Sequence, residues 1–328
     1  MNTRKAKEES FPTKSGALLR SSKPLEYAVG QVLEEIGLTA NGPYWYERDG
    51  KACETDHLAS SFEVQDYFSV RHHVFVECEY RESSKEWVFF GATRNVMERS
   101  EISILDGFVR TKSGRPFSLL GLRHENPLEL PRVGPSTEVF KDQKGGWQFN
   151  PQSVDNAIRQ AILPVCNHLG AALRKSLMMH DPAVVDLYHP IIVTTAGLYV
   201  LRDEVASKSL DDLADLTKSF RRVPAVLSCF NSPEYAVSFL NERVSSALSE
   251  VKPDIETAEG KLMLSGFPPQ PPRALRAQDI HRLVLEAVPS RVLVIGFESL
   301  QATLSGYLDI LRKRIREEFR RFTAVGAL

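Results

Sequence analysis

The chain has 328 residues, of which 42% are hydrophobic and 25% charged, as is typical of a globular protein with a substantial core. Its formal net charge of -1 excludes a generally basic nucleic-acid-binding protein, although a local basic surface would be enough for such a partner. The four cysteines have no C-x-x-C spacing, which argues against a structural zinc site or a disulfide framework. No run approaches the roughly 20 apolar residues of a membrane span, and the polar amino terminus does not resemble a secretory signal. We therefore expect a cytoplasmic protein.

The first part of the chain predicts a polar tail, a helix and three strands. Residues 1–23 are polar and basic without periodic apolar residues, and we expect a flexible tail there. Residues 24–38 have apolar residues at helical spacing, with Ser22 as a candidate cap. The strand predictions are 43–48, 52–60 and 72–81. Asp49 and Gly50 form a strong hairpin signal between the first two strands.

The remainder predicts one domain, residues 24–328, with insertions near 110–150 and 204–290. The first insertion is rich in Gly, Pro and charged residues and is expected to be irregular. A long helix is predicted over 151–179, with Pro164 as a kink or break. The other predictions are a hairpin of 191–193 with 198–201, strands at 223–229 and 291–297, a loop at 252–276 and a helix at 299–322.

Acidic residues on the second and third predicted strands indicate a metal site. Alternation along a strand puts Glu77 and Glu79 on the same face. Two neighbouring carboxylates on a mostly apolar strand repel each other and are costly to bury, and Mg²⁺ would remove that cost. If the two strands pair antiparallel, Asp56 faces Glu77 and three oxygens converge. Such a site would polarise a phosphate and lower the pKa of bound water.

Each candidate also has a purely structural interpretation. Glu77 and Glu79 can line a solvent-facing strand, and Glu26 suits the first turn of its helix because acids there complement the helix dipole. His72 and His73 could ligate a metal or act as bases, but scattered histidines are more often surface residues. The helix residue Gln160 is expected to face solvent.

Four short motifs resemble those of the PD-(D/E)xK nuclease superfamily, in particular its bacterial restriction-endonuclease-like branch. They are Leu25-Glu26-Tyr27, Glu54-Thr55-Asp56, Val76-Glu77-Cys78-Glu79 and the aromatic run Trp87 to Phe90. The resemblance implies an α/β fold with a restriction-endonuclease-like mixed sheet flanked by helices. It also implies Mg²⁺ or Mn²⁺ held by Asp56, Glu77 and Glu79, with Glu26 hydrogen-bonded to a metal-bound water. DNA is the implied substrate, with RNA as an alternative.

The sequence departs from the family pattern at one position, because Glu79 stands where the family usually has lysine. Two interpretations follow. Either Glu79 binds the metal and helps to deprotonate the attacking water, or the domain no longer cleaves and serves as a nucleic-acid-binding or scaffolding module. Arg81 and Lys85 are candidates for the missing positive charge. The sequence leaves the oligomeric state open, with a homodimer as one alternative.

Overall fold

The computed structural model describes residues 21–64, 69–92, 103–106, 126, 128–142, 144–178, 184–202, 216–231, 233–257, 263–264, 273–274, 281, 284–285 and 288–324. The principal helices are α2 (Lys23–Glu35), α4 (Pro151–Met178), α6 (Glu234–Thr257) and α8 (Leu300–Ala324), with short helices α5 (Leu216–Ser219) and η3 (Phe297–Ser299). No helix, over its described residues, is long and apolar enough to cross a membrane.

The described strands form one large mixed sheet and two small ones. In order across the large sheet they are β1 (Thr39–Ala40), β4 (His57–Val64), β5 (Ser69–Glu79), β10 (Val184–Thr194), β16 (Arg291–Gly296), β13 (Ala225–Cys229), β8 (Arg132–Lys141), β6 (Glu86–Gly91), β11 (Gly197–Leu201) and β12 (Phe220–Arg222). Strand β7 (Ser103–Asp106) also pairs with β10, and β9 (Trp147–Asn150) with β8. The small sheets are β2 (Tyr44–Arg48) with β3 (Lys51–Thr55), and β14 (Met263–Leu264) with β15 (Arg273–Ala274).

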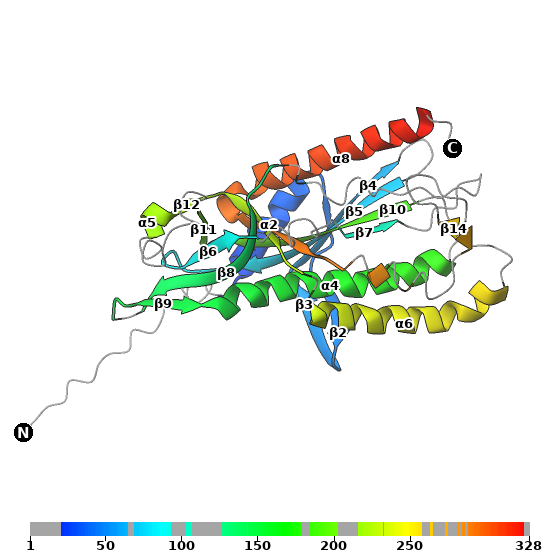
Figure 1. The fold of residues 1–328 in the computed structure, drawn as a ribbon, viewed down its shortest axis with the longest axis horizontal. Helices are drawn as coiled ribbons and strands as arrows, with labels where there is room; N and C mark the ends of the chain where they lie inside the picture. Colours follow the sequence, from blue (N-terminus) through cyan, green and yellow to red (C-terminus); the bar gives the residue numbers. More distant parts are fainter. Residues whose placement is uncertain are drawn as a thin grey trace, which may run out of the picture.

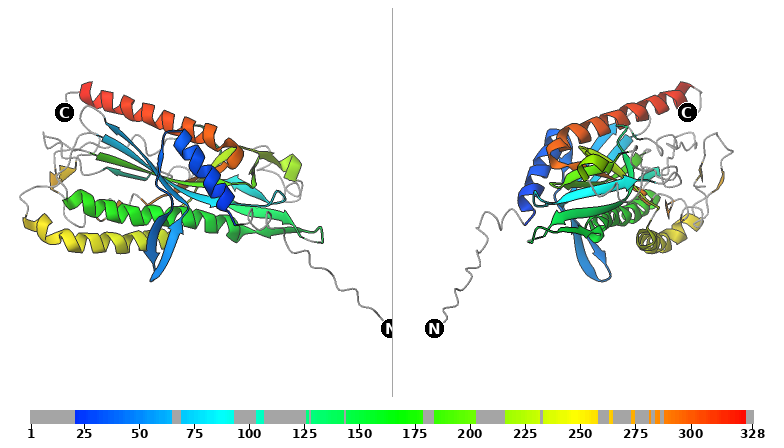
Figure 2. Two further views of the ribbon diagram at one scale, coloured as in Figure 1. Left: turned by 180° about the vertical axis from the view of Figure 1, so that it is seen from behind. Right: turned by 60° about the vertical axis from the view of Figure 1, so that its left-hand side comes forward.

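Helices cover both faces of the large sheet (Figures 1 and 2). Strand alternation divides the apolar side chains between two cores. Val193 and the rest of one set pack with α2 and α8, whereas Ile192 and the opposite set pack with α4 and α6. The result is a mixed α/β sheet between two helical layers, as the sequence predicts at that level.

Predictions that rest on local signals are confirmed. The first helix, β2, β5, β13, β16 and the last helix lie close to their predicted positions. Asp49 and Gly50 form the turn between β2 and β3, both with positive φ (51° and 70°). Gln160 is exposed. Residues 151–178 form one helix that continues through Pro164, so the alternative of a break there is wrong.

Predictions about pairing and insertions are corrected in three places. Strands β10 and β11 do not form a hairpin, since β11 pairs with β6 and β12. Residues 132–141 of the expected irregular insertion form β8, inside the large sheet. The second predicted strand is two strands, β3 and β4, with Asp56 between them.

The predicted insertion near 204–290 includes β13, which pairs with both β16 and β8 inside the large sheet. Its predicted loop at 252–276 begins within α6, which continues to Thr257. The rest of that loop, apart from β14 and β15, lies outside the described residues, as does the expected tail up to residue 20.

Candidate functional site

Asp56 lies at the point where the chain changes its strand partner. Strand β3 pairs with β2, whereas β4 pairs with β5 from His57 opposite Val76 onward. The Asp56 carboxylate Oδ2 accepts a hydrogen bond of 2.7 Å from the backbone N–H of Cys78. The predicted antiparallel register is therefore confirmed, and Asp56 lies beside the end of β5 that carries Glu77 and Glu79.

Glu77 is buried with few hydrogen-bond partners. Its side chain is 7% exposed, and the Thr55 hydroxyl lies 3.4 Å from its Oε2. Burial, together with the charges of Asp56 and Glu79, raises the pKa of Glu77 to about 9. Burial also raises the pKa of Asp56 to about 6, against the opposing effect of the Cys78 hydrogen bond. Without a cation, Glu77 is therefore protonated at neutral pH.

Glu79 forms an ion pair with an arginine that lies two residues after it, just beyond the end of β5. Arg81 Nη1 lies 2.8 Å from Glu79 Oε2. Burial raises the pKa of Glu79, and the Arg81 charge opposes this effect. The positive charge expected at Arg81 is thus next to Glu79, whereas Lys85 Nζ lies 3.8 Å from a different carboxylate, that of Glu138.

Glu138 is the acidic residue that the sequence analysis missed. It lies on β8 and is 2% exposed, and its Oε2 accepts three hydrogen bonds. The donors are Arg81 Nε at 2.8 Å, Ser153 Oγ at 3.0 Å and Trp87 Nε1 at 3.1 Å. The available signal was one acid directly before the apolar pair Val139-Phe140. It was lost because this segment was expected to be irregular.

Glu26 lies near the same carboxylates but has a partner of its own. Its carboxylate is 2.6 Å from Lys23 Nζ, and its backbone carbonyl accepts a hydrogen bond of 2.8 Å from His57 Nε2. The charge of Glu26 contributes to the raised pKa values of Asp56 and Glu77. Both the first-turn interpretation and a supporting role beside Asp56 agree with this position.

The donor set fits a cation only in part. No group of three or more His, Cys, Asp or Glu residues is arranged to hold a metal ion within the described ranges. Glu79 forms an ion pair with Arg81. The charges of Asp56 and Glu79 both affect the pKa of Glu77, but the three expected ligands do not form a complete ligand set. Asp56 and Glu77 remain, and Mg²⁺ commonly takes one or two carboxylates together with waters and substrate phosphate. These two residues are the pair that would hold it.

A cavity of about 440 Å³ opens at the end of β10, the strand that pairs with β5. It lies where β10 and β16 end, and Thr194, Thr195, Arg222 and Phe297 are among the residues that line it. Thr194 pairs with Glu79 across the parallel ladder, and its hydroxyl donates a 2.9 Å hydrogen bond to the Glu79 carbonyl. Ligands of α/β proteins commonly bind beyond the carboxyl ends of parallel strands.

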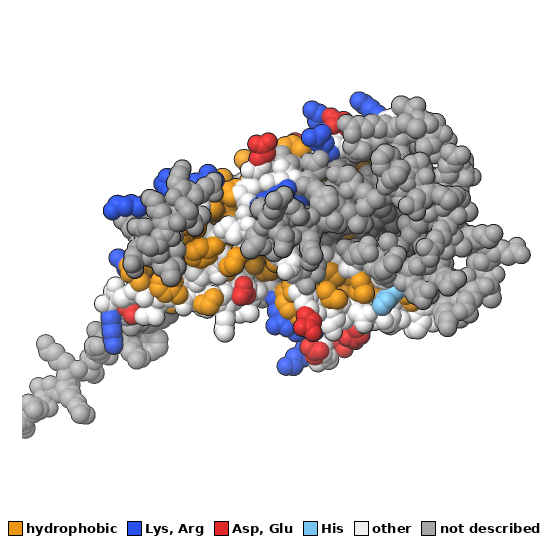
Figure 3. Space-filling model, in the orientation of Figure 1, with side chains coloured by type: hydrophobic (Ala, Val, Ile, Leu, Met, Phe, Trp, Pro, Cys, Tyr) orange, Lys and Arg blue, Asp and Glu red, His pale blue; other side chains and the backbone are white. Residues whose placement is uncertain are grey.

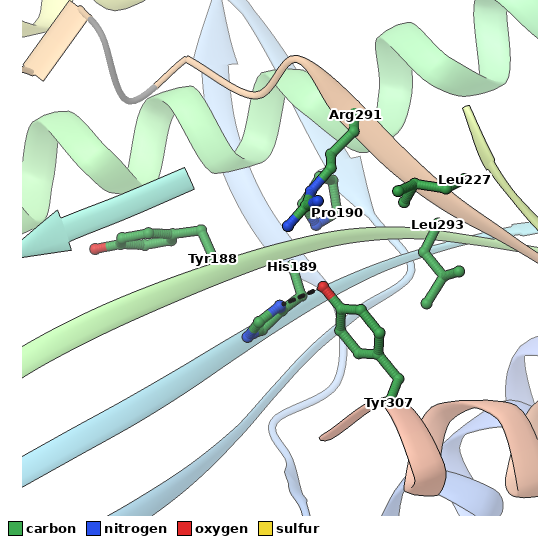
Figure 4. A pocket seen from close by; sticks show the side chains of 7 residues that line it. All are labelled: Tyr188, His189, Pro190, Leu227, Arg291, Leu293 and Tyr307. Atoms are coloured by element: carbon green, nitrogen blue, oxygen red, sulfur yellow. Dashed lines mark hydrogen bonds between the residues drawn. The ribbon is translucent and has the colours of Figure 1, made fainter. Parts of the chain in front are cut away.

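The histidines are buried, so their expected surface position is wrong. His72 is 0% exposed and His73 5%. His72 Nδ1 lies 3.0 Å from His189 Nε2, and the Tyr307 hydroxyl lies 3.4 Å from His189 Nδ1 (Figure 4). The adjoining cavity, of about 10 Å³, has room for about one water molecule. His72 and His189 therefore belong to the core between β5, β10 and α8, whereas His73 is bound to Asp186 on the opposite face of the sheet.

Comparison with known proteins gives no relative from which a function can be carried over. No family model, no curated protein and no solved structure matches the chain. What the structure defines is a mixed α/β protein with a buried acidic cluster at the end of β5.

The buried pairing of Glu138 predicts a measurable contribution to stability. We expect Glu138→Gln to lower the free energy of unfolding by about 2 kcal/mol. This is less than the ~3–5 kcal/mol lost when a buried ion pair is fully broken, because Arg81 retains its ion pair with Glu79. Denaturant unfolding of the wild type and the variant measures this difference. Glu317→Gln, which removes the exposed α8 pair with Arg314, is the control and should cost less than about 1 kcal/mol. Equal effects of the two substitutions would contradict the burial argument.

The buried histidines predict a pH-dependent stability. Burial lowers the pKa of His72 to about 3 and that of His189 well below its usual 6.5. Below about pH 6.5 the unfolded chain therefore takes up protons that the folded protein does not, and stability falls as pH is lowered. We expect His72→Gln to show a shallower loss between pH 6.5 and 4 in urea unfolding. Parallel curves for the variant and the wild type would show that His72 is not held neutral.

Proposed function

We propose that this protein is a divalent-metal-dependent nuclease that hydrolyses DNA phosphodiester bonds. The supporting observation is the position of Asp56 beside Glu77 and Glu79, all three with raised pKa values. Ionisable groups with shifted pKa values are common at functional sites, because catalysis requires pKa values matched to the reaction. The motif resemblance supplies the reaction class, and the restriction-endonuclease-like form of the mixed sheet belongs to the same proposal.

In this mechanism Asp56 and Glu77 would hold the cation. When bound, Mg²⁺ or Mn²⁺ would polarise the phosphate and lower the pKa of a coordinated water. Glu79 accepts the proton of the attacking water, whose oxygen forms a bond to phosphorus as the bond to the leaving oxygen breaks. Arg81 keeps the Glu79 carboxylate in place, and Glu138 holds Arg81 from β8. Part of the nucleic-acid strand would lie in the cavity lined by Thr194, the ladder partner of Glu79.

The proposal predicts metal-dependent cleavage that requires Asp56. Supercoiled and linear DNA are incubated with purified protein and Mg²⁺ or Mn²⁺, and we expect nicking or cleavage. Asp56→Asn should reduce the rate at least about 100-fold, the size typical of losing one positioned catalytic group. Glu54→Gln is the matched control, since Glu54 is an exposed acid two positions away on β3. An Asp56→Asn variant that cleaves DNA at the wild-type rate would contradict the proposal.

A second function is favoured by the state of Glu79. Its ion pair with Arg81 and the absence of a three-ligand group in the described part of the chain agree with a module that has lost cleavage. Such a module would bind or scaffold a partner through a nuclease-like fold. The two functions differ in whether the acidic pair binds metal.

Calorimetric titration with Mn²⁺ at several pH values separates them. A working site must release the protons of Glu77 and Asp56, whose pKa values are about 9 and about 6, so affinity should rise with pH from 6 to 9. Asp56→Asn should abolish this binding. An idle module would bind weakly at every pH and equally in the variant. Cleavage gained only by Glu79→Lys would also favour the second function.

A further inference from the structure

A second large cavity lies at the point where two neighbouring strands separate. Strands β13 and β8 run parallel but pair only at Leu227 with Arg132 and Ser228 with Val133. Strand β13 then ends at Cys229, whereas β8 continues along β6. The cavity occupies about 510 Å³ beyond this divergence, between β8, α4 and the start of α6. Strand carboxyl ends at a point of divergence are where α/β sheets commonly bind ligands.

The cavity has an apolar interior and an open polar mouth. Ile158 and Cys229 are buried at its base, whereas Asp155, Asn156 and Asn231 are exposed at its edge. Figure 3 shows hydrophobic side chains gathered on this face of the molecule, over β8 and the first half of α4. A volume of this size suits a small organic molecule, and such pockets commonly combine apolar walls with a few polar groups.

One cation in the lining is held in place and has hydrogen-bonding capacity to spare. The Arg159 guanidinium carbon lies 4.7 Å from the centroid of the Tyr235 ring, a cation–π contact that restrains the side chain. Arg159 Nε is buried and has no hydrogen-bond partner among the described residues. Leaving a buried N–H of a charged group unsatisfied is costly, and a carboxylate or phosphate is the group that pairs best with arginine.

We propose that this cavity binds a small organic anion, with its carboxylate or phosphate on Arg159 and its apolar body against Tyr235 and Phe230. The exposed Asp155, one helical turn before Arg159, lies at the mouth and opposes the negative charge of the ligand. The site is separate from the acidic cluster at the end of β5, and the proposal does not depend on the nuclease function.

The test compares ligands of the same shape and different charge. Benzoate, phenyl phosphate and uncharged benzamide are titrated into the full-length protein by calorimetry. Benzoate or phenyl phosphate should bind, and benzamide should bind at least about tenfold more weakly, a difference of about 1.4 kcal/mol. The stronger of the two anions identifies the preferred head group. Binding of benzamide as tight as that of the stronger anion, or no binding of either anion, would overturn the proposal.

Two pairs of variants locate the site. Arg159→Gln should weaken binding of the anions at least about tenfold, whereas Arg221→Gln, at an exposed arginine on β12, should not. If Arg159→Gln fails to fold, Asn156→Trp blocks the mouth, with Gln160→Trp as its control at another exposed position of α4. Binding that persists in both Arg159→Gln and Asn156→Trp would show that the anion lies elsewhere.

Discussion

The parallel pairing of β5 with β10 is the constraint on which the other features depend. It runs without interruption from Ser69 opposite Val184 to Glu79 opposite Thr194. Because parallel partners point their side chains to the same sides, this ladder assigns Phe75 and Ile192 to one core and Val76 and Ile191 to the other. It also places His72 and His189 side by side in the interior.

The same ladder determines where the acidic cluster lies. It ends at Glu79, and Asp56 reaches this end because β4 runs antiparallel to β5 from His57 onward. The cluster therefore combines an ordered scaffold with an electrostatic conflict, since burial and mutual repulsion raise the pKa of Glu77 and of Asp56. Thr55 and the Cys78 amide relieve only part of this conflict. The remaining negative charge must be neutralised by a bound cation or by protonation of the carboxylates.

How far the sequence could predict this arrangement depends on the range of each signal. The Asp49-Gly50 turn and the alternation of Glu77 and Glu79 are local, and they were predictable from backbone preferences alone. The place of β8 in the sheet depends on distant partners, and its Gly134 and Pro135 indicate a loop when taken alone. In the structure Pro135 lies opposite the register shift between Phe89 and Gly91. A missing backbone donor is tolerated at such an irregularity.

The environment of Glu79 shows why the charge balance at this position could not be predicted from the local sequence alone. An arginine two residues further on, Arg81, contacts both Glu79 and Glu138, so a positive charge lies next to the Glu79 carboxylate. That charge is divided between two carboxylates, and Glu138 also accepts hydrogen bonds from Trp87 and Ser153. Both ion pairs of Arg81 are 2.8 Å long, and the bonds from Trp87 and Ser153 fix the position of the Glu138 carboxylate. Arg81 therefore links Glu79, at the end of β5, to a carboxylate that is anchored on β8.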